Sequence, residues 1–208
     1  MRRNLEDLGE IGRRWGATRD LARYISGRAR ELDLRGVAVL DVGAGSGEGT
    51  LGLRRALIRA GLAAEVLALD LKWRHLAAGR LIAAEPARAV SADGFRMPFR
   101  DGAFDFAVST LFFHHFSPDE NRRLLAELRR VARHGFAMLD VRRHRIPELF
   151  LGLVGPAIFR ARITTEDGVA SVRQAYTPSE ALAVAREVDP RSTLRRIFPY
   201  RILVAGGA

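Results

Sequence analysis

Glycines and acidic residues recur in this 208-residue chain where apolar segments end, in spacings that suit a nucleotide-type ligand. The first such group runs from Asp41 to Thr50 and has glycines at positions 43, 45 and 47. Glycine lets a backbone turn tightly and approach a ligand without a Cβ clash. A dinucleotide-binding loop needs a small residue at position 48, and a phosphate-binding P-loop needs Lys followed by Ser or Thr. The chain has Glu48 there, whose charge disfavours a pyrophosphate.

Two further acids follow the next apolar segments. Asp70 comes after residues 65–69 and can accept both hydroxyls of a ribose, with an N-cap of the following helix as the alternative. Asp93 precedes Gly94 and can accept an adenine amino group, or act only as a turn residue. Three such positions at three segment ends favour a common ligand over coincidence.

Two adjacent histidines, His114 and His115, follow the segment that ends at Ser109. Histidine titrates near neutral pH, so either one can serve as a general base that takes the proton from a hydroxyl group of a substrate, the acceptor of a transferred group. The alternative is a local hydrogen bond at the start of the next helix. No third ligand stands at a suitable spacing, so we expect no metal site.

Residues that could contact an acceptor lie in three other places. Arg142, Arg143 and His144 follow the apolar segment 136–141 and can grip a carboxylate or phenolate, or remain solvated. Trp15 in the N-terminal region and the apolar run 149–159 can line a cap over a hydrophobic acceptor. The alternative is that these apolar residues only pack added helices onto the sheet.

The elements that must position these residues alternate between strand and helix periodicity. Strands are predicted at 37–42, 65–70, 87–91, 104–109, 136–141, 193–198 and 200–205, and helices at 4–34 (two), 48–60, 73–84, 118–133, 146–163 and 178–187. This order predicts a three-layer α/β domain with a mostly parallel sheet. Ligands bind such sheets outside the carboxyl ends of the strands, where the candidate residues stand.

The segment Leu40 to Gly47, Leu-Asp-Val-Gly-Ala-Gly-Ser-Gly, resembles motif I of the class I, Rossmann-like S-adenosylmethionine-dependent methyltransferases. The resemblance implies S-adenosylmethionine as cofactor, S-adenosylhomocysteine as product, and no pyrophosphate for Glu48 to repel. It implies that the loop backbone meets the methionine part of the cofactor while Asp41 orients the loop. The implied cofactor-binding residues are Asp41, Gly43, Ala44, Gly45, Gly47, Asp70 (ribose), Leu71 and Asp93 with Gly94 (adenine), and Ser109.

The segment Pro98 to Asp105 resembles the P-F-x-D-x-x-F-D segment of the methyltransferase type 11 and quinone-biosynthesis branch. The resemblance covers about residues 35–141 and implies a seven-stranded sheet with an antiparallel C-terminal strand. Residues 162–176 resemble a lid of small-molecule methyltransferases associated with type III polyketide synthases, which places Tyr176 near the acceptor. We therefore expect one domain, with an N-terminal helical cap (1–34), a cofactor-binding core (35–141), a lid (142–177) and a C-terminal helix and strand pair (178–208).

These features predict direct methyl transfer to a small hydrophobic or aromatic acceptor such as a phenol, a quinone or a polyketide-like compound. The net charge of +10 raises an RNA-directed methyltransferase as the alternative. However, Lys72 is the only lysine and the other 33 of the 34 Lys and Arg residues are arginines, which favours codon bias over selected phosphate binding. A 2′-O-methyltransferase relies on two lysines, and this chain has one. The absence of cysteine excludes methylation at pyrimidine C5, and residues 109–112 lack the motif of base-amino methylation. A cofactor-binding regulatory protein without turnover stays open.

The N-terminus has no apolar segment typical of a signal peptide, and the longest apolar run, 149–159, is too short to span a bilayer. We therefore expect a cytoplasmic protein. The sequence does not decide the oligomeric state, or whether the methyl group goes to oxygen, carbon or nitrogen.

Overall fold

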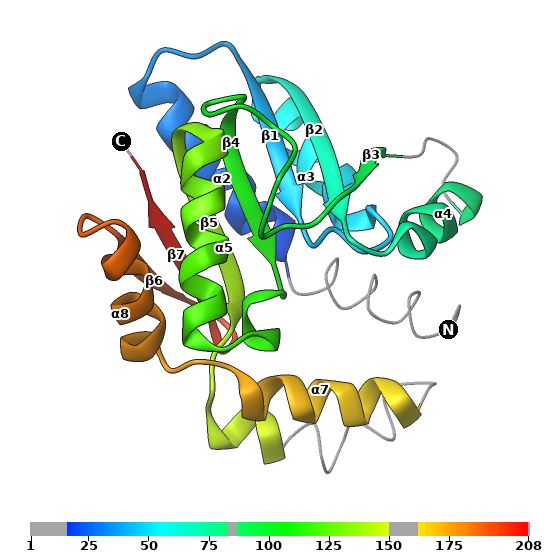
Figure 1. Ribbon diagram of the computed structural model, residues 1–208, viewed down its shortest axis with the longest axis vertical. Helices are drawn as coiled ribbons and strands as arrows, with labels where there is room; N and C mark the ends of the chain where they lie inside the picture. The colour runs from blue at the N-terminus through cyan, green and yellow to red at the C-terminus, as the bar shows by residue number, and fades with distance from the viewer. Residues whose placement is uncertain (1–15, 83–86, 150–161, 208) are drawn as a thin grey trace.

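A seven-stranded sheet with helices on both faces forms the molecule (Figure 1). The computed structural model describes residues 16–82, 87–149 and 162–207. The strands are β1 (Gly36–Val42), β2 (Ala63–Asp70), β3 (Arg88–Ser91), β4 (Phe104–Thr110), β5 (Ala132–Val141), β6 (Thr193–Ile197) and β7 (Arg201–Gly206). The helices are α2 (Ala17–Glu31), α3 (Glu48–Arg59), α4 (Trp73–Ile82), η1 (Phe113–His115), α5 (Pro118–Val131), α7 (Arg162–Gln174) and α8 (Pro178–Val188).

The strand order is β3-β2-β1-β4-β5-β7-β6, which confirms the predicted fold class. Strands β1 to β5 pair in parallel, whereas β7 is antiparallel to both β5 and β6. The parallel strands therefore end at one edge of the sheet, here called the carboxyl edge. β1 lies between β2 and β4, so the chain order reverses beside β1. This is the switch point where open α/β sheets bind ligands.

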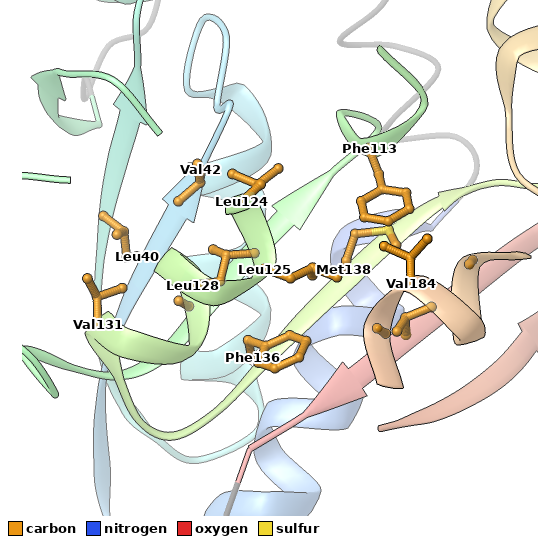
Figure 2. Packing of buried hydrophobic residues seen from close by; sticks show 14 of the residues in the cluster. Leu40, Val42, Phe113, Leu124, Leu125, Leu128, Val131, Phe136, Met138 and Val184 are labelled. Atoms are coloured by element: carbon orange, nitrogen blue, oxygen red, sulfur yellow. The ribbon is translucent and has the colours of Figure 1, made fainter. Parts of the chain in front are cut away.

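Two hydrophobic layers hold the helices to the sheet. On one face, Leu21 and Ile25 of α2 and Leu53 and Leu57 of α3 pack against the strands. On the other face, leucines of α5 and Val184 of α8 surround Phe136 (Figure 2). Each of these side chains is nearly or fully buried, which stabilises the fold by roughly 1.5–3 kcal/mol per large apolar side chain.

Local sequence signals fix where α5 and α8 begin. Ser117 caps α5 and Thr177 caps α8, and each forms a capping box with the glutamate three residues later. Each cap is followed by a proline at the first helical position, where a missing N–H costs nothing. Both helix starts were predicted from sequence, and the structure confirms them.

The largest differences from the predicted elements lie where α5 meets β5 and at α7. α5 ends at Val131 and β5 begins at Ala132, four residues before the predicted strand, because the backbone at Ala132 is already extended (φ −93°, ψ 131°). Residues 162–174 form α7, which was not predicted as a separate helix. The predicted first helix of the N-terminal cap and most of the predicted helix 146–163 lie outside the described residues. The division into functional parts therefore stays a prediction.

None of the described helices is long and apolar enough to cross a membrane. α7 lies across the carboxyl edge of the sheet in Figure 1, below the strands, and follows the segment that leads out of β5. α7 contacts η1, the short helix that follows β4.

Candidate functional site

The glycine loop between β1 and α3 has the backbone that the sequence predicts. Gly43, Gly45 and Gly47 have φ angles of +74°, +57° and +79°, in the region that other residues rarely adopt. A Cβ on Gly43 would come within 2.5 Å of the Phe112 ring, so this glycine allows the loop to pack on the segment after β4. A Cβ on Gly45 would meet nothing within 4 Å, so this side of the loop is open to a ligand.

Asp41 stands below this loop as a fully buried acid. Its Oδ2 accepts a 2.7 Å hydrogen bond from Thr50 Oγ1 in the first turn of α3, which ties the strand to the helix. Burial raises the pKa of the Asp41 carboxyl to about 6, while the Thr50 hydrogen bond lowers this pKa and the negative charge of Asp70 raises it further. The geometry fits the predicted role of orienting the loop.

Asp70 joins the glycine loop to the end of β2. Its Oδ2 accepts a hydrogen bond of 2.9 Å from Gly45 N, and its Oδ1 accepts one of 2.8 Å from Lys72 N. A carboxylate oxygen has two lone-pair sites, so each Asp70 oxygen keeps one acceptor position. Asp70 thus both caps the turn into α4 and can still accept two hydroxyl groups. The next side chain, Leu71, is 67% exposed and offers an apolar surface beside this acid.

Asp93 and Gly94 complete the same edge after β3. Asp93 is exposed, and its Oδ1 accepts a 2.9 Å hydrogen bond from Phe95 N, which leaves Oδ2 available. Gly94 is buried, and a Cβ there would lie 3.1 Å from Val42 Cγ1. This turn therefore packs against the end of β1 and holds the acid toward solvent.

Two contacts that sequence reasoning did not assign also shape this edge. A Cβ on Gly79 would lie 1.8 Å from the Ser46 carbonyl oxygen, so only glycine lets α4 approach the glycine loop this closely. A glycine inside a predicted helix was the sequence signal for this close contact.

Ser109, predicted as cofactor-binding, is fully buried and donates a 2.9 Å hydrogen bond to the Val42 carbonyl. Its side chain therefore joins β4 to β1.

The segment that resembles P-F-x-D-x-x-F-D is held by Arg130 of α5. The Arg130 guanidinium donates to the carbonyls of Met97 and Phe99 and forms an ion pair with Asp101. Phe99 and Phe104 pack edge to face, with ring centroids 4.9 Å apart. These contacts fix the loop that enters β4, so the segment is a structural feature of the fold.

The two predicted histidines differ in their surroundings. His114 is buried, and its Nδ1 lies 2.8 Å from Oδ1 of Asp140, while its backbone N–H donates to Asp140 Oδ2 at 3.0 Å. A carboxylate only accepts, so Nδ1 carries the proton and Nε2 is left as the basic nitrogen. His115 is exposed, and its ring packs on His114 with centroids 4.1 Å apart. Asp140 is the partner that sequence reasoning did not assign.

The backbone is strained just before these histidines. Leu111 has φ +52°, a conformation that costs a non-glycine residue free energy and that clusters at functional sites. Its N–H donates a 2.9 Å hydrogen bond to the Leu139 carbonyl of β5, which holds the turn in place. β4 and β5 therefore jointly position η1 and its histidines at the carboxyl edge.

The candidate acceptor residues after β5 have unequal freedom. Arg143 donates from Nη2 to both carboxylate oxygens of Glu180, at 2.6 and 2.8 Å, so its charge is already paired. The Arg142 guanidinium lies over the Tyr200 ring, 5.1 Å from its centroid. His144 also packs on Tyr200, and its Nδ1 accepts from Ile146 N. Of the two arginines, the geometry favours Arg142 for an acceptor.

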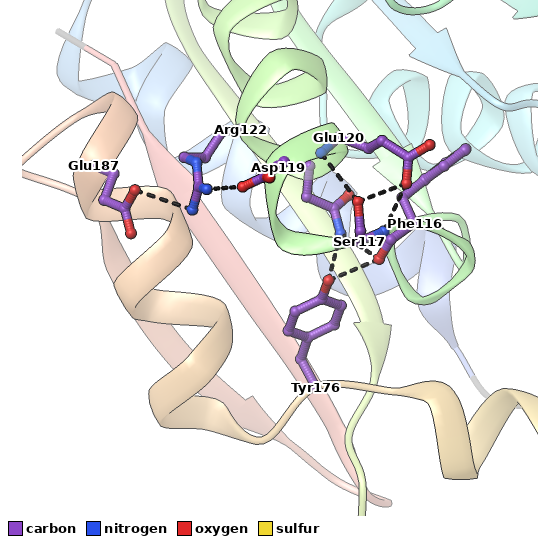
Figure 3. A network of polar contacts seen from close by, with 8 residues as sticks. Phe116, Ser117, Asp119, Glu120, Arg122, Tyr176 and Glu187 are labelled. Atoms are coloured by element: carbon purple, nitrogen blue, oxygen red, sulfur yellow. Dashed lines mark hydrogen bonds and ion pairs between the residues drawn. The ribbon is translucent and has the colours of Figure 1, made fainter.

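Tyr176 lies in a hydrogen-bond network beneath η1 (Figure 3). Its hydroxyl donates to the Phe116 carbonyl at 2.7 Å and accepts from Asn121 Nδ2 at 3.1 Å. Its ring packs on Phe113, and burial raises the pKa of the Tyr176 hydroxyl. These contacts tie Tyr176 to the histidine segment from below, and its contact with the acceptor stays a prediction. Trp15, the other predicted aromatic contact, lies outside the described residues.

Comparison with known proteins agrees with this geometry. The family model described as "Methyltransferase domain" matches residues 39–135, which include the glycine loop, Asp70, Asp93 and the histidines. No curated protein matches the sequence. Among solved structures, a SAM-dependent methyltransferase from Aquifex aeolicus aligns with a TM-score of 0.56 and 19% identity, over 81% of this chain and 80% of that one.

Two solved structures with named activities share the fold at lower identity. Magnesium protoporphyrin IX methyltransferase from Synechocystis, with bound SAH, aligns with a TM-score of 0.60 and 12% identity, over 94% of this chain and 83% of that one. Human N-acetylserotonin methyltransferase, in complex with SAM, aligns with a TM-score of 0.64 and 12% identity over 98% of this chain. The chain spans only 54% of the human protein.

Proposed function

We propose that this chain methylates a small hydrophobic or aromatic acceptor by direct displacement of the methyl group. The premise is that the chain is a class I, Rossmann-like S-adenosylmethionine-dependent methyltransferase. The observation that carries the proposal is the joint placement of an open glycine loop, the ribose-type acid Asp70 and a His114–Asp140 pair at one carboxyl edge. A phenol, a quinone or a polyketide-like compound is the expected class of acceptor.

The residues at this edge fit the cofactor. Gly45 leaves space for the methionine part, Asp70 keeps two acceptor positions for ribose hydroxyls, and Leu71 offers apolar surface to adenine. Asp93 keeps Oδ2 for the adenine amino group. When bound, S-adenosylmethionine supplies a methyl group on a positively charged sulfur, which a nucleophile can displace directly.

The chain contributes alignment and proton transfer to this reaction. Orientation at contact distance and exclusion of water lower the barrier without covalent catalysis. We assign His114 as the general base for an acceptor that is still protonated, because Asp140 holds Nδ1–H and leaves Nε2 free to accept. An acceptor that is already an enolate needs only alignment. His115, which is exposed beside it, is the alternative base.

Calorimetric titration with S-adenosylmethionine tests the cofactor site. Asp70→Ala removes the ribose acceptor and the Gly45 contact, and Gly45→Leu fills the open side of the loop, so we expect each to weaken binding by about tenfold or more. Asp101→Ala, in the loop before β4, is the matched control and should bind as the wild type does. Unchanged affinity in both site variants would overturn the assignment of these residues.

A screen of acceptors tests the reaction. Phenols, quinones and polyketide-like compounds are incubated with S-adenosylmethionine and the full chain, and a methylated product is sought by mass spectrometry. We expect turnover with at least one aromatic class. Cofactor binding without any methylated product across these classes, together with methylation of RNA, would favour the RNA-directed alternative.

A further inference from the structure

A tyrosine in the turn between β6 and β7 contacts two basic side chains that follow β5. Tyr200 immediately precedes β7, and its carbonyl accepts a 2.8 Å hydrogen bond from the backbone N–H of Arg142, the first residue after β5. The Arg142 guanidinium lies over the Tyr200 ring, 5.1 Å from its centroid, and the His144 ring packs on the same tyrosine at 4.9 Å. All three residues are half-buried. We call these three residues the Tyr200 cluster.

The register of β5 and β7 places this cluster on the same face of the sheet as the proposed base. Asp140, whose carboxylate holds the ring of His114, pairs in register with Ile202. Two residues away on each strand, Arg142 and Tyr200 continue this pairing through their backbone hydrogen bond. Side chains two residues apart on a strand share a face, and the step is roughly 7 Å. The Tyr200 cluster therefore lies about one aromatic ring's length from the end of β5 that holds His114.

The Arg142 guanidinium has donors to offer to a ligand. It makes no ion pair with any acid in residues 16–82, 87–149 and 162–207, whereas the neighbouring Arg143 is paired with Glu180. The Tyr200 ring restrains the guanidinium without occupying its N–H groups. The planar fork of these N–H groups matches a carboxylate, which can accept two parallel hydrogen bonds. Arg142 is thus both held in place and chemically suited to a carboxylate.

His144 adds a second donor beside this guanidinium. Its Nδ1 accepts a 3.2 Å hydrogen bond from Ile146 N, so the neutral ring carries its proton on Nε2. A protonated ring nitrogen can only donate, which suits an anionic oxygen. Tyr200 itself has φ +45°, a conformation that costs a non-glycine residue free energy and that clusters at functional sites.

We propose that Arg142 and His144, held on Tyr200, bind a carboxylate carried by the methyl acceptor. The inference rests on the proposed function and narrows its acceptor to an aromatic acid whose reacting group points toward His114. β4 separates β5 from β1, so the cluster lies two strand spacings, roughly 10 Å, from the end of the strand that leads into the glycine loop. The cofactor's own carboxylate, expected at that loop, therefore has a separate place.

A comparison of an acid with its neutral amide tests the proposal. The full chain is saturated with S-adenosylhomocysteine, and calorimetry measures the binding of 4-hydroxyphenylacetate, 4-hydroxyphenylacetamide and acetate. We expect the aromatic acid to bind about tenfold more tightly than the amide, as for a charge-assisted hydrogen bond at a half-buried site. We expect acetate, which lacks the aromatic ring, to bind more weakly than the aromatic acid.

Variants assign the preference for the acid to the cluster. Arg142→Met should remove this preference, and Arg142→Lys should keep part of it. Tyr200→Leu should reduce the preference, whereas Tyr200→Phe, which keeps the ring, should retain it. The matched control is Arg195→Met, which removes one exposed arginine of β6 that pairs in register with Leu203, on the face of the sheet that packs against α2 and α3. This control should keep the full preference.

Titration of each variant with S-adenosylhomocysteine separates the acceptor site from the cofactor site. Arg142→Met should bind S-adenosylhomocysteine as the wild type does, which also shows that the variant is folded. A loss of about tenfold or more in that affinity, in a folded variant, would assign Arg142 to the cofactor and overturn the proposal. If Arg142→Met does not fold, the wild-type comparison of acid and amide and the two Tyr200 variants still decide it.

The remaining outcomes distinguish this inference from the proposed function. Equal binding of acid and amide, or a full preference for the acid in Arg142→Met, would overturn the carboxylate site and leave the methyltransferase assignment intact. Acetate that binds as tightly as the aromatic acid would overturn the link to an aromatic acceptor. Failure of S-adenosylhomocysteine to bind the wild type would instead count against the cofactor site, and the comparison of acid and amide on the free chain would still decide the carboxylate site.

Discussion

The surroundings of single residues give the acids of this site different tasks. Asp70 faces the ligand edge and keeps free acceptor positions, whereas Asp41 is fully buried and bonded to Thr50. The two stand at the ends of adjacent strands and differ only in burial and partners. The same residue type therefore stabilises the fold in one place and, in the function that we propose, binds the cofactor in the other.

Asp41 makes stability depend on pH. Burial is the main cause that raises its pKa from 3.8 to about 6, so the folded state holds this proton more tightly than the unfolded chain does. The contribution of Asp41 to the free energy of unfolding is therefore greatest below about pH 4 and is lost as the pH rises through 6. The loss amounts to roughly 3 kcal/mol. Asp41→Asn, which does not titrate, should show none of it.

Urea unfolding at pH 4, 5, 6 and 7 checks this prediction. The free energy of unfolding of Asp41→Asn, relative to the wild type, should rise across this range, while the exposed control Asp33→Asn should follow the wild type. A constant difference between Asp41→Asn and the wild type would show that Asp41 is not held protonated by burial.

The His114–Asp140 pair predicts the behaviour of two variants in catalysis. Asp140→Asn keeps the shape but can donate to Nδ1, which favours the wrong tautomer, so turnover of a phenol should fall by about a hundredfold or more. His114→Gln should lose turnover similarly, while calorimetry shows the wild-type affinity for S-adenosylmethionine in both.

A comparison of two acceptors distinguishes a base from a structural residue. With a phenol acceptor, which must lose a proton, His114→Gln should lose most of the turnover. For an acceptor that is already ionised, the His114→Gln loss should shrink. A uniform loss for both acceptors would return His114 to a purely structural role.

At the scale of elements, one glycine decides how close α4 can lie to the glycine loop. A Cβ on Gly79 would lie 1.8 Å from the backbone oxygen of Ser46. Gly79→Ala must push α4 away from the loop, so we expect a loss of about 1–3 kcal/mol in stability. We also expect a drop of about tenfold in affinity for S-adenosylmethionine.

Gly27→Ala is the matched control, because Gly27 is also inside a helix and a Cβ there would meet nothing within 4 Å. It should leave the cofactor affinity unchanged and stabilise the fold by up to about 1 kcal/mol. Thermal unfolding measures the stability of the two variants, and calorimetry measures their affinity for S-adenosylmethionine. Equal affinity in Gly79→Ala and the wild type would mean that α4 does not shape the cofactor site.

The Tyr176 network joins the segment before α8 to the start of α5. Tyr176→Phe removes the hydrogen bonds to the Phe116 carbonyl and Asn121, so we expect a loss of about 1–2 kcal/mol in the free energy of unfolding. The KM for the acceptor should change little if the role is structural. A large rise in KM with unchanged stability would support the earlier prediction that Tyr176 contacts the acceptor.

At the scale of the whole molecule, several arginines of the described residues are held in ion pairs, within a net charge of +10. Arg88 pairs with Glu65, Arg133 with Asp105, and Arg143 with Glu180, while Arg130 also pairs with two acids. The four arginines that line a groove of about 600 Å³ between α5 and α8 include Arg122, which pairs with Asp119 and Glu187. Paired guanidinium groups attract a phosphate backbone less than free ones do.

We therefore expect no tight RNA binding despite the net charge of +10. Fluorescence anisotropy with a labelled RNA should show weak binding at low salt that disappears near physiological salt, as for non-specific phosphate contacts. Binding that is tight and saturable at physiological salt would favour the RNA-directed alternative over a small acceptor.

The sequence by itself determined the fold class, the order of most elements and which glycines and acids follow the parallel strands. Buried apolar runs that end in Gly43, Asp70 and Asp93 specify parallel strands and their carboxyl ends, because local periodicity and turn chemistry act over short distances. Capping signals at Ser117 and Thr177 also fixed two helix starts, since a cap and its helix are neighbours in the chain.

Only the tertiary structure decided which side chains meet across the sheet. The partners His114 and Asp140 are 26 residues apart, and Arg201 meets Asp20 from opposite ends of the chain. Strand order and register create these pairs, and neither follows from local pattern. The same packing gave Tyr176 its hydrogen bonds to Phe116 and Asn121 and left Arg201 with two donors that have no partner among the described residues. Burial and partners, unlike spacing, are properties of the folded molecule.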